Sequence, residues 1–279
     1  MDLKESKYMK LRKEQEREFH NRLRRGISEQ RWSPKIEEII KSDSLWSNMK
    51  YYSIERKSRL LVFDWLAQRC NGRRILDYCC GNGEDSIIAA KIGAKEVIGI
   101  DISEVSIENC KERAIREGVG KNTSFYVMDA EALEFDDNYF DIIIEYGSLH
   151  HLNLQKAYRE LARVLKPDGE IICTEALRHN PVIHLYRKIT PHLRTPWEVD
   201  HILGKSELKM AKKYFGKVEA SFFHLATLCA VPFRNMTFFP RLLKILEDVD
   251  SILLSIPFVK WQAWQVVFVL AQPNKSLFR

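Results

Sequence analysis

Two apolar segments, each ending in an aspartate, flank a glycine-rich turn in the first third of the chain. The first segment lies in ILDYCCGNGEDS at residues 75–86, and the second is VIGIDIS at residues 97–103. Gly81 and Gly83 have no Cβ, so the backbone of the turn can approach a ligand closely. Asp101, at the end of the second segment, can accept hydrogen bonds from both hydroxyls of a ribose. The pattern predicts a strand, turn, helix and strand that hold a nucleotide-type cofactor.

A glycine turn of this kind also occurs in dinucleotide dehydrogenases, whose motif is G-x-G-x-x-G. The third glycine of that motif is Ser86 here, so the dehydrogenase pattern fails. Three further motifs follow in order: VMDAEAL at 127–133, FDIIIEYGSLHHL at 140–152 and LKPDGEIICTEAL at 165–177. Each reads as a strand that leads into a loop, and the last begins with a Pro-Asp-Gly turn.

Taken together, these motifs make residues 60–273 resemble the class I S-adenosylmethionine-dependent methyltransferases. The resemblance implies an α/β, Rossmann-like fold with a seven-stranded, mostly parallel sheet and an antiparallel last strand. It also implies an enzyme of the EC 2.1.1 class that uses S-adenosylmethionine and releases S-adenosylhomocysteine. The quinone, isoprenoid and natural-product branches, which act on small molecules, are the most similar.

The resemblance assigns the cofactor site residue by residue. Gly81 and Gly83 would lie against the methionine moiety, Asp101 would bind the ribose, and Asp129 would accept from the adenine amino group. Cys79 departs from the family, which usually has glycine there, and a strand-end acid can alternatively cap a turn. The full predicted set is Asp77, Tyr78, Cys79, Gly81, Gly83, Asp101, Ile102, Asp129, Ala130, Glu145, Tyr146 and, from the N-terminal region, Tyr52.

Two residues are candidates for a general base, because an acceptor hydroxyl, amine or carbon acid must lose a proton. Glu175 lies at the end of the fifth predicted strand, where its side chain could face the methyl group. His151 lies in the loop after the fourth strand. The alternatives are a salt bridge from Glu175 to an arginine and a structural hydrogen bond for His151. His179 and His201 have no metal-ligand spacing with carboxylates, so no metal is expected.

The domain organisation follows from charge and periodicity. Residues 1–58 are predicted to form a helical N-terminal cap with a basic arm, and residues 59–279 the methyltransferase domain. Eleven Lys or Arg against six acids in residues 1–35 could bind nucleic acid or anionic lipid, or could form a solvated, salt-bridged helix. The arm is expected to be helical over 4–25, with a second short helix starting at Ser33-Pro34.

The chain beyond the cap alternates between strands and helices, which predicts a parallel sheet. Strands are expected near 73–78, 96–100, 123–128, 139–145, 170–175, 218–226 and 263–272, and helices near 54–69, 84–92, 104–117 and 154–165. Two insertions, 176–217 and 227–262, should form the substrate cap. Residues 176–197 contain four Lys or Arg and no acid, and residues 220–233 contain no charge. These features favour an amphipathic substrate with an anionic head.

Composition narrows the class of protein further. The 279 residues are 45% hydrophobic and the six cysteines show no C-x-x-C spacing, so a reduced, cytoplasmic protein is expected. No secretion signal and no uncharged run of about 18 to 20 residues is visible, which leaves at most peripheral membrane association.

Two other classes of function remain open from the sequence. One is an RNA or protein methyltransferase that uses the basic arm, although nucleic acid is disfavoured because Glu145 to Ser148 replaces the Asn/Asp-Pro-Pro-aromatic motif of base-amino methyltransferases. The other is a non-catalytic partner that retains the fold. The acceptor atom and the oligomeric state are left undetermined.

Overall fold

The computed structural model describes residues 3–25 and 48–278. The short helix predicted from Ser33-Pro34 lies outside the described residues. One seven-stranded sheet forms the centre of the molecule, in the order β3-β2-β1-β4-β5-β7-β6. The strands are β1 (Arg74–Tyr78), β2 (Glu96–Asp101), β3 (Thr123–Val127), β4 (Phe140–Tyr146), β5 (Leu165–Ala176), β6 (Phe215–Phe223) and β7 (Gln265–Pro273).

The topology confirms the predicted fold. Strands β1 to β5 pair in parallel, while β7 runs antiparallel to both β5 and β6. Strand β6 begins three residues earlier than the predicted start at 218, because Phe215 pairs with Pro273 and is buried. The order reverses at β1, and the carboxyl ends of β1, β2 and β4 therefore meet at one edge. In open α/β sheets, ligands bind at this edge.

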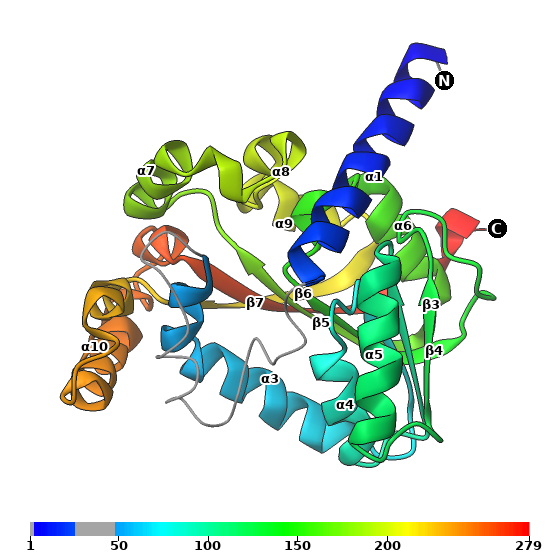
Figure 1. The fold of residues 1–279 in the computed structure, drawn as a ribbon, viewed down its shortest axis with the longest axis horizontal. Helices are drawn as coiled ribbons and strands as arrows, with labels where there is room; N and C mark the ends of the chain where they lie inside the picture. The colour runs from blue at the N-terminus through cyan, green and yellow to red at the C-terminus, as the bar shows by residue number, and fades with distance from the viewer. Residues whose placement is uncertain (1–2, 26–47, 279) are drawn as a thin grey trace.

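Helices cover both faces of the sheet (Figure 1). On one face lie α3 (Arg56–Arg69), α4 (Glu84–Lys91) and α5 (Glu104–Arg116), whose apolar residues form one core with alternate residues of the strands. On the other face lie α6 (Leu154–Val164) and α9 (Lys205–Ala211). Parallel strands buried on both sides have continuous apolar runs, as residues 142–144 of β4 do.

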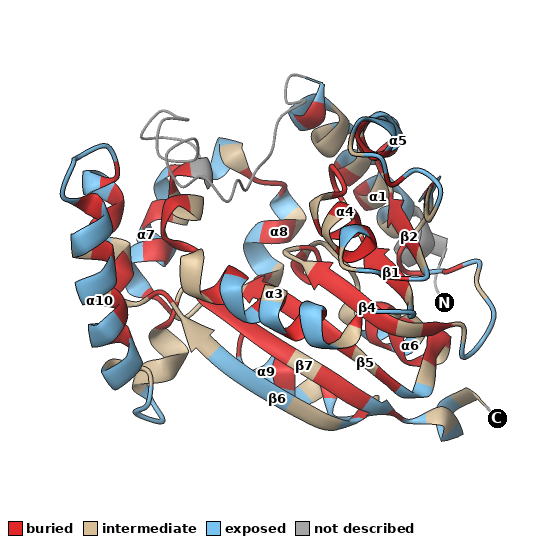
Figure 2. Cartoon of the chain, turned by 90° about the horizontal axis from the view of Figure 1, so that it is seen from below, coloured by how far each residue is buried: buried red, intermediate tan, exposed pale blue. Residues whose placement is uncertain are grey.

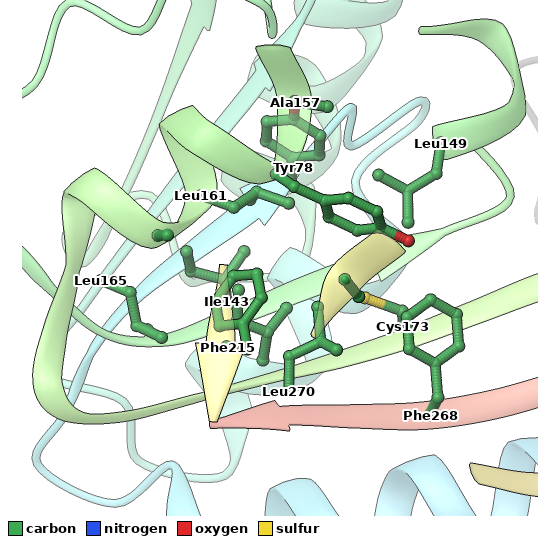
Figure 3. Close-up of a cluster of buried hydrophobic side chains, with 14 of the residues drawn as sticks. Tyr78, Ile143, Leu149, Ala157, Leu161, Leu165, Cys173, Phe215, Phe268 and Leu270 are labelled. Carbon is green, nitrogen blue, oxygen red and sulfur yellow. The ribbon is translucent and has the colours of Figure 1, made fainter. Parts of the chain in front are cut away.

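The core beneath α6 shows how this packing is built (Figure 3). Leu161 of α6 is fully buried in the same cluster as Ile143 of β4 and Phe268 of β7. Tyr78 also belongs to this cluster, and its hydroxyl donates to the carbonyl of Ala130 at 2.6 Å. Burying each of the large side chains contributes about 1.5 to 3 kcal/mol.

The N-terminal helix α1 (Leu3–Arg24) packs beside α5 and crosses the edge where the parallel strands end (Figure 1). Its contacts with the domain are polar. Asn21 accepts from the Ser103 hydroxyl at 2.6 Å and donates to Glu104 at 2.9 Å. The short helix η1 (Asn48–Ile54) follows and leads into α3.

The two insertions are mainly helical. The first contains α7 (Pro181–Ile189), η3 (Pro191–Leu193), α8 (Pro196–His201) and α9, and the second contains η4 (Ala226–Phe233), α10 (Phe239–Leu253) and η5 (Val259–Gln262). Helix α7 begins after Asn180, whose side chain accepts from the Ile183 amide, and Pro181 suits the first turn. Helices α7 and α10 lie at the same end of the molecule (Figures 1 and 2).

Two further short helices are η2 (Leu149–His151), directly after β4, and η6 (Lys275–Phe278) at the end of the described chain. Across residues 3–25 and 48–278, the helices are too short or too polar to cross a lipid bilayer.

Candidate active site

A cavity of about 670 Å³ lies where the parallel strands end. Its volume is within the range of small-molecule sites. Helix α1, η1, the loops after β2, β3 and β4, the end of β5, α7 and η3 all contribute to its wall. A smaller cavity of about 50 Å³ adjoins it at the glycine turn, and the two share Arg24, Tyr52, Glu55, Cys79 and Tyr146.

Most of the predicted cofactor residues meet at these two cavities. The large cavity is lined by Tyr52, Cys79, Asp101, Ile102, Asp129, Ala130 and Tyr146. The small one is lined by Asp77 and Gly81, together with Tyr52, Cys79 and Tyr146. The structure therefore brings together residues from the ends of four strands and from the N-terminal cap.

Three predicted residues, Tyr78, Gly83 and Glu145, line neither of the two cavities described above. The Tyr78 side chain lies in the core. Gly83 starts α4 at φ +73°, and a Cβ there would lie 2.9 Å from the sulfur of Cys110, so this glycine serves helix packing. Glu145 is buried and its carboxylate accepts from the amide and hydroxyl of Ser148. Glu145 thus holds the loop after β4 in place and does not contact a ligand in either cavity.

Asp101 holds the turn and lines the cavity at the same time. One carboxylate oxygen accepts from the Gly81 amide at 2.9 Å and the other accepts from the Ser103 amide at 2.9 Å. Its residue surface is only 8% exposed. A carboxylate fixed by two backbone amides is preorganised, because its orientation is set before a ligand arrives.

Asp129 is in contact with the N-terminal helix. Its carboxylate forms an ion pair with Lys13, and it also accepts from the Glu131 amide at 2.9 Å. Next to it, Arg12 pairs with Glu131, with both side chains buried, and lies 4.6 Å over the ring of Trp197. These ion pairs attach α1 to the loop after β3.

The turn after β1 is tighter than its glycines alone require. Cys79 has φ +59°, a left-handed conformation that costs a non-glycine residue about 1 to 2 kcal/mol. A Cβ on Gly81 would lie 2.8 Å from a guanidinium nitrogen of Arg24. Gly81 therefore lets the Arg24 side chain approach the turn, which the sequence pattern did not reveal.

Glu175 does not face the cavity, which corrects its expected position. Thr174 and Ala176 line the cavity, and successive side chains of a strand point to opposite faces, so Glu175 points the other way. It is buried and accepts from the Leu149 amide at 2.6 Å. Its second oxygen lies 2.6 Å from Nδ1 of His150, a residue that does line the cavity.

His150 was missed by the sequence reasoning, although it is the neighbour of the predicted His151. Burial lowers the pKa of His150, so the ring is neutral and its Nδ1–H donates to Glu175. Burial raises the pKa of Glu175 to about 7. Burial also raises the pKa of Glu145, with the charge of Glu175 adding to it, and the carboxyl groups of both residues accept from the Leu149 amide. The three side chains form one buried network.

His151 also lines the cavity, and its partner is on α1. Its Nδ1 lies 3.0 Å from Glu16. Burial alone would lower the pKa of His151, but the hydrogen bond and charge of Glu16 outweigh burial and raise it. Glu16 also accepts from Thr195 at 2.5 Å and lies 3.7 Å from His20. The predicted hydrogen-bonding role of His151 is thus present, and it links α1 to the loop after β4.

Metal binding was not expected from His179 and His201. The structure brings other ligand types together, namely Glu16, His20 and His151, and also His150, His151 and Glu198. Glu16, His20, His151 and His150 make the contacts described above, and Glu198 lies 3.4 Å from Arg194. The expectation of no metal stays a prediction.

Two cations from helices surround the glycine turn. Arg59 of α3 forms a buried ion pair with Asp85 and lies 5.0 Å over the ring of Tyr146. Arg24 of α1 lines both cavities. The Tyr146 hydroxyl donates to Glu55 at 2.5 Å. At this end of the site, the two arginines suit a carboxylate of a ligand, and Glu55 suits an amine of a ligand.

The opposite end of the large cavity is aromatic and positive. The rings of Tyr51 and Tyr186 lie 5.2 Å apart, and Trp264 lies 5.3 Å from Tyr51. Burial, together with the nearby charge of Arg194, lowers the pKa of Arg187 to about 10. We call this end, lined by Tyr51, Ile183, Tyr186, Arg187, His192, Arg194 and Trp264, the acceptor chamber.

Comparison with known proteins identifies the fold and its family. A model of a methyltransferase domain matches residues 70–216, more than half of the chain. The chain belongs to this methyltransferase domain family. Membership confirms the predicted family and its S-adenosylmethionine cofactor. The fold of the chain is similar to that of the solved geranyl diphosphate C-methyltransferase from Streptomyces coelicolor A3(2), with a TM-score of 0.61 and 14% sequence identity. This likeness covers 94% of this chain and 97% of the other.

Two curated methyltransferases share higher identity over shorter regions. The 27-O-demethylrifamycin SV methyltransferase of Amycolatopsis mediterranei is 39% identical over 101 residues, which are 36% of this chain and 37% of the relative. The demethylmenaquinone methyltransferase of Lactococcus lactis is 34% identical over 120 residues, which are 42% of this chain and 46% of the relative. The chain thus spans less than half the length of these two relatives.

The residues present fit S-adenosylmethionine. The Asp101 carboxylate lines the cavity and retains lone pairs for ribose hydroxyls. Gly147 has φ +64° and open space where a Cβ would be, so the backbone after β4 can approach a ligand. Arg24, Arg59 and Glu55 provide opposite charges for the carboxylate and amine of a methionine moiety.

Proposed function

We propose that this protein transfers a methyl group from S-adenosylmethionine to a small amphipathic molecule with an anionic head. One observation carries the proposal: a single cavity joins the Asp101 end, which fits the cofactor, to the acceptor chamber with Arg187 and Arg194. A donor and an acceptor bound in one enclosed space can be held in line, which supplies much of the acceleration of a displacement reaction.

When bound, S-adenosylmethionine supplies an electrophilic methyl group on a sulfonium. Asp101 holds the ribose, and Tyr146 and Tyr52 exclude water from the region between donor and acceptor. An acceptor O–H, N–H or C–H group must lose one proton, and His150 Nε2 takes it. Glu175 accepts the Nδ1–H of His150 and stabilises the positive charge that develops on the ring.

Glu175 is therefore proposed as a positioning residue and His150 as the base. This assignment replaces direct proton removal by Glu175, because the Glu175 side chain faces away from the cavity. His151 retains a structural role through Glu16. Similar arrangements place a carboxylate behind a histidine to fix its tautomer.

The acceptor chamber supports the substrate class. Arg187 and Arg194 favour an anion, and Tyr186 and Trp264 favour an apolar or aromatic body. The solved geranyl diphosphate C-methyltransferase was crystallised with geranyl diphosphate, Mg²⁺ and S-adenosyl-L-homocysteine. The curated relatives are named for demethylmenaquinone and demethylrifamycin, which are also small molecules.

An RNA or protein substrate is less well supported. The basic arm was the reason to consider it, yet Arg12, Lys13 and Arg17 of α1 all pair with acids of this chain. These pairs favour the salt-bridged helix over a free cationic arm. Full-length protein and protein without residues 1–25 should therefore show the same RNA retention in filter binding over a range of salt concentrations.

The first test is binding of S-adenosylhomocysteine followed by a thermal melt. A ligand at 100 times its Kd stabilises the native state by about 2.7 kcal/mol, which raises Tm by several degrees. NAD should cause no shift. If S-adenosylhomocysteine also causes none at saturation, the proposed activity is refuted. The acceptor can then be sought by incubating cell extract with radiolabelled methyl donor and partitioning the product between organic and aqueous phases.

A further inference from the structure

Helix α7 separates the acceptor chamber from solvent and is apolar on both sides. Ile183 and Tyr186 face inward and line the chamber. Val182, Leu185 and Ile189 are 65%, 61% and 57% exposed, and their spacing places them on one outward stripe. The stripe does not contribute to the core, so the fold by itself does not require it.

A second set of exposed apolar side chains lies at the same end of the molecule (Figures 1 and 2). Helix α10 buries Phe239 and Leu243 against η4 and Ile54, while its opposite face is turned to solvent. Ile252 is 70% exposed and Phe258, just after the helix, is 79% exposed. The whole set is Phe233, Met236, Phe238, Ile245, Val249, Ile252, Ile256 and Phe258.

We call the outward stripe of α7 together with this second set the α7–α10 surface. Such an accumulation of large apolar side chains marks an interaction site, because soluble proteins rarely expose many of them in one region. Isolated exposed apolar residues elsewhere, such as Ile115 on α5, need no such explanation.

The charges on the α7–α10 surface are mostly positive. Lys188, Arg241 and Lys244 are exposed, and among the described residues of α7 and 226–262 Asp248 is the exposed acid. The other two acids of α10 are buried. Glu247 pairs with Arg56, and Asp250 accepts from the amides that open η4. Apolar side chains interspersed with Lys and Arg are the composition of surfaces that bind the interface of anionic membranes.

We propose that the α7–α10 surface docks on an anionic membrane. Docking would place α7, the wall of the acceptor chamber, against the lipid interface. An amphipathic acceptor could then pass from the bilayer past α7 with its anionic head directed to Arg187 and Arg194. This second step rests on the proposed function, whereas docking by itself does not.

Vesicle sedimentation with the full chain tests the docking. The protein should bind vesicles of phosphatidylcholine mixed with phosphatidylglycerol and bind pure phosphatidylcholine much more weakly. The double variants Leu185→Glu/Ile189→Glu and Ile252→Glu/Phe258→Glu should each lower partitioning at least tenfold. Ile115→Glu is the control for an added surface glutamate, because it places one at a 76% exposed apolar residue on α5, away from this end.

Two controls separate the outcomes. Each variant should keep the wild-type thermal shift with S-adenosylhomocysteine, which shows that the fold and the cofactor site are intact. Equal loss by the Ile115→Glu control, or no wild-type binding to anionic vesicles, would overturn the proposal. So would a dimer in solution that the α7 and α10 variants dissociate, because the surface would then join two copies. Vesicle binding without any cofactor-induced shift would uphold docking and refute the methyltransferase activity instead.

Discussion

The left-handed backbone at Cys79 shows how single residues shape the site. With φ +59°, this residue adopts the conformation for which the family normally uses glycine. The strain is confined to the turn, where Asp101 holds the Gly81 amide and the Ser86 amide and hydroxyl both donate to Asp77. The surrounding hydrogen bonds therefore keep a strained residue at the wall of the proposed cofactor site.

Asp101 offers a direct test of the cofactor site. We expect Asp101→Asn to weaken S-adenosylhomocysteine binding by about 1.5 to 3 kcal/mol, because a charge-assisted hydrogen bond to the ribose becomes a neutral one. Isothermal titration calorimetry measures the change. Asp168→Asn, at an exposed residue near the start of β5, is the matched control. Unchanged affinity in Asp101→Asn would reject the ribose assignment.

The buried network around His150 predicts a pH dependence. Glu175 has a pKa raised to about 7 by burial, and only its carboxylate form can stabilise a protonated His150. We therefore expect kcat to rise with pH through about 7 and to fall as Glu175 becomes protonated at lower pH. The profile of kcat against pH should lose this step in Glu175→Gln.

His150→Gln tests the base itself. We expect kcat to fall by about 10² to 10⁴, the usual contribution of a positioned base, with little change in cofactor affinity. His184→Gln on the exposed side of α7 should behave like the wild type. Full turnover in His150→Gln would show that the acceptor needs no base at this position.

At the scale of elements, α1 is the part whose placement most affects the site. It contributes Arg12, Lys13, Glu16, His20 and Arg24 to the cavity wall, although it is more than 70 residues away from most of its partners in sequence. Its attachment is largely polar, through buried and half-buried ion pairs. Buried pairs are costly to break because the remaining charge stays unpaired.

Arg12→Ala should loosen α1. Removing Arg12 leaves the buried Glu131 carboxylate without this partner, which costs about 3 to 5 kcal/mol for a buried pair. Amide hydrogen exchange in α1 should accelerate and S-adenosylhomocysteine should bind more weakly. Arg17→Ala removes exposed pairs with Glu14 and with Glu104 of α5, which are worth little, and should change neither. If both variants exchanged equally fast, the Arg12 pair would not be what holds the helix.

At the scale of the whole molecule, His224 ties α3, on one face of the sheet, to the second insertion. This buried residue follows β6, and its ring nitrogens lie 2.9 Å from the Ser58 hydroxyl and 3.3 Å from the Thr227 hydroxyl. Ser58 belongs to α3, so His224 joins α3 to the segment between β6 and η4, which is distant from it in sequence. Burial, together with the charge of Lys57, lowers the pKa of His224 to about 3.

This pKa predicts how global stability responds to acid. The native protein keeps His224 neutral, whereas the unfolded chain takes up a proton below pH 6.5. The stabilisation is therefore complete above pH 6.5 and is lost as the pH falls toward 3. Urea unfolding measures the free energy of unfolding at pH 7.5 and at pH 5. Between these pH values, His224→Asn should lose about 2 kcal/mol less of this free energy than the wild type, because asparagine does not titrate. Asparagine also tolerates the positive φ of 67° at this position. Equal losses would contradict the assignment.

The alternation of strands and helices could be predicted from sequence because apolar periodicity and turn residues are local properties. The ends of β1, β2 and β3 were placed within one or two residues, and the parallel order followed from the crossover helices. The antiparallel β7 came from family resemblance. Asp101 was assigned as a carboxylate at the end of a strand, whereas Asp129 and Tyr146 came from the same resemblance.

The tertiary structure decided the rest of the site. Alternate side chains of β5 point to opposite faces of the sheet, and those of Thr174 and Ala176 face the cavity, so Glu175 faces away. Only the packed sheet shows which of the two alternating sets faces the site. Arg24 and Arg59 reach the glycine turn from helices far from it in sequence. No local pattern marks such residues, because their contacts come from how α1 and α3 pack on the sheet.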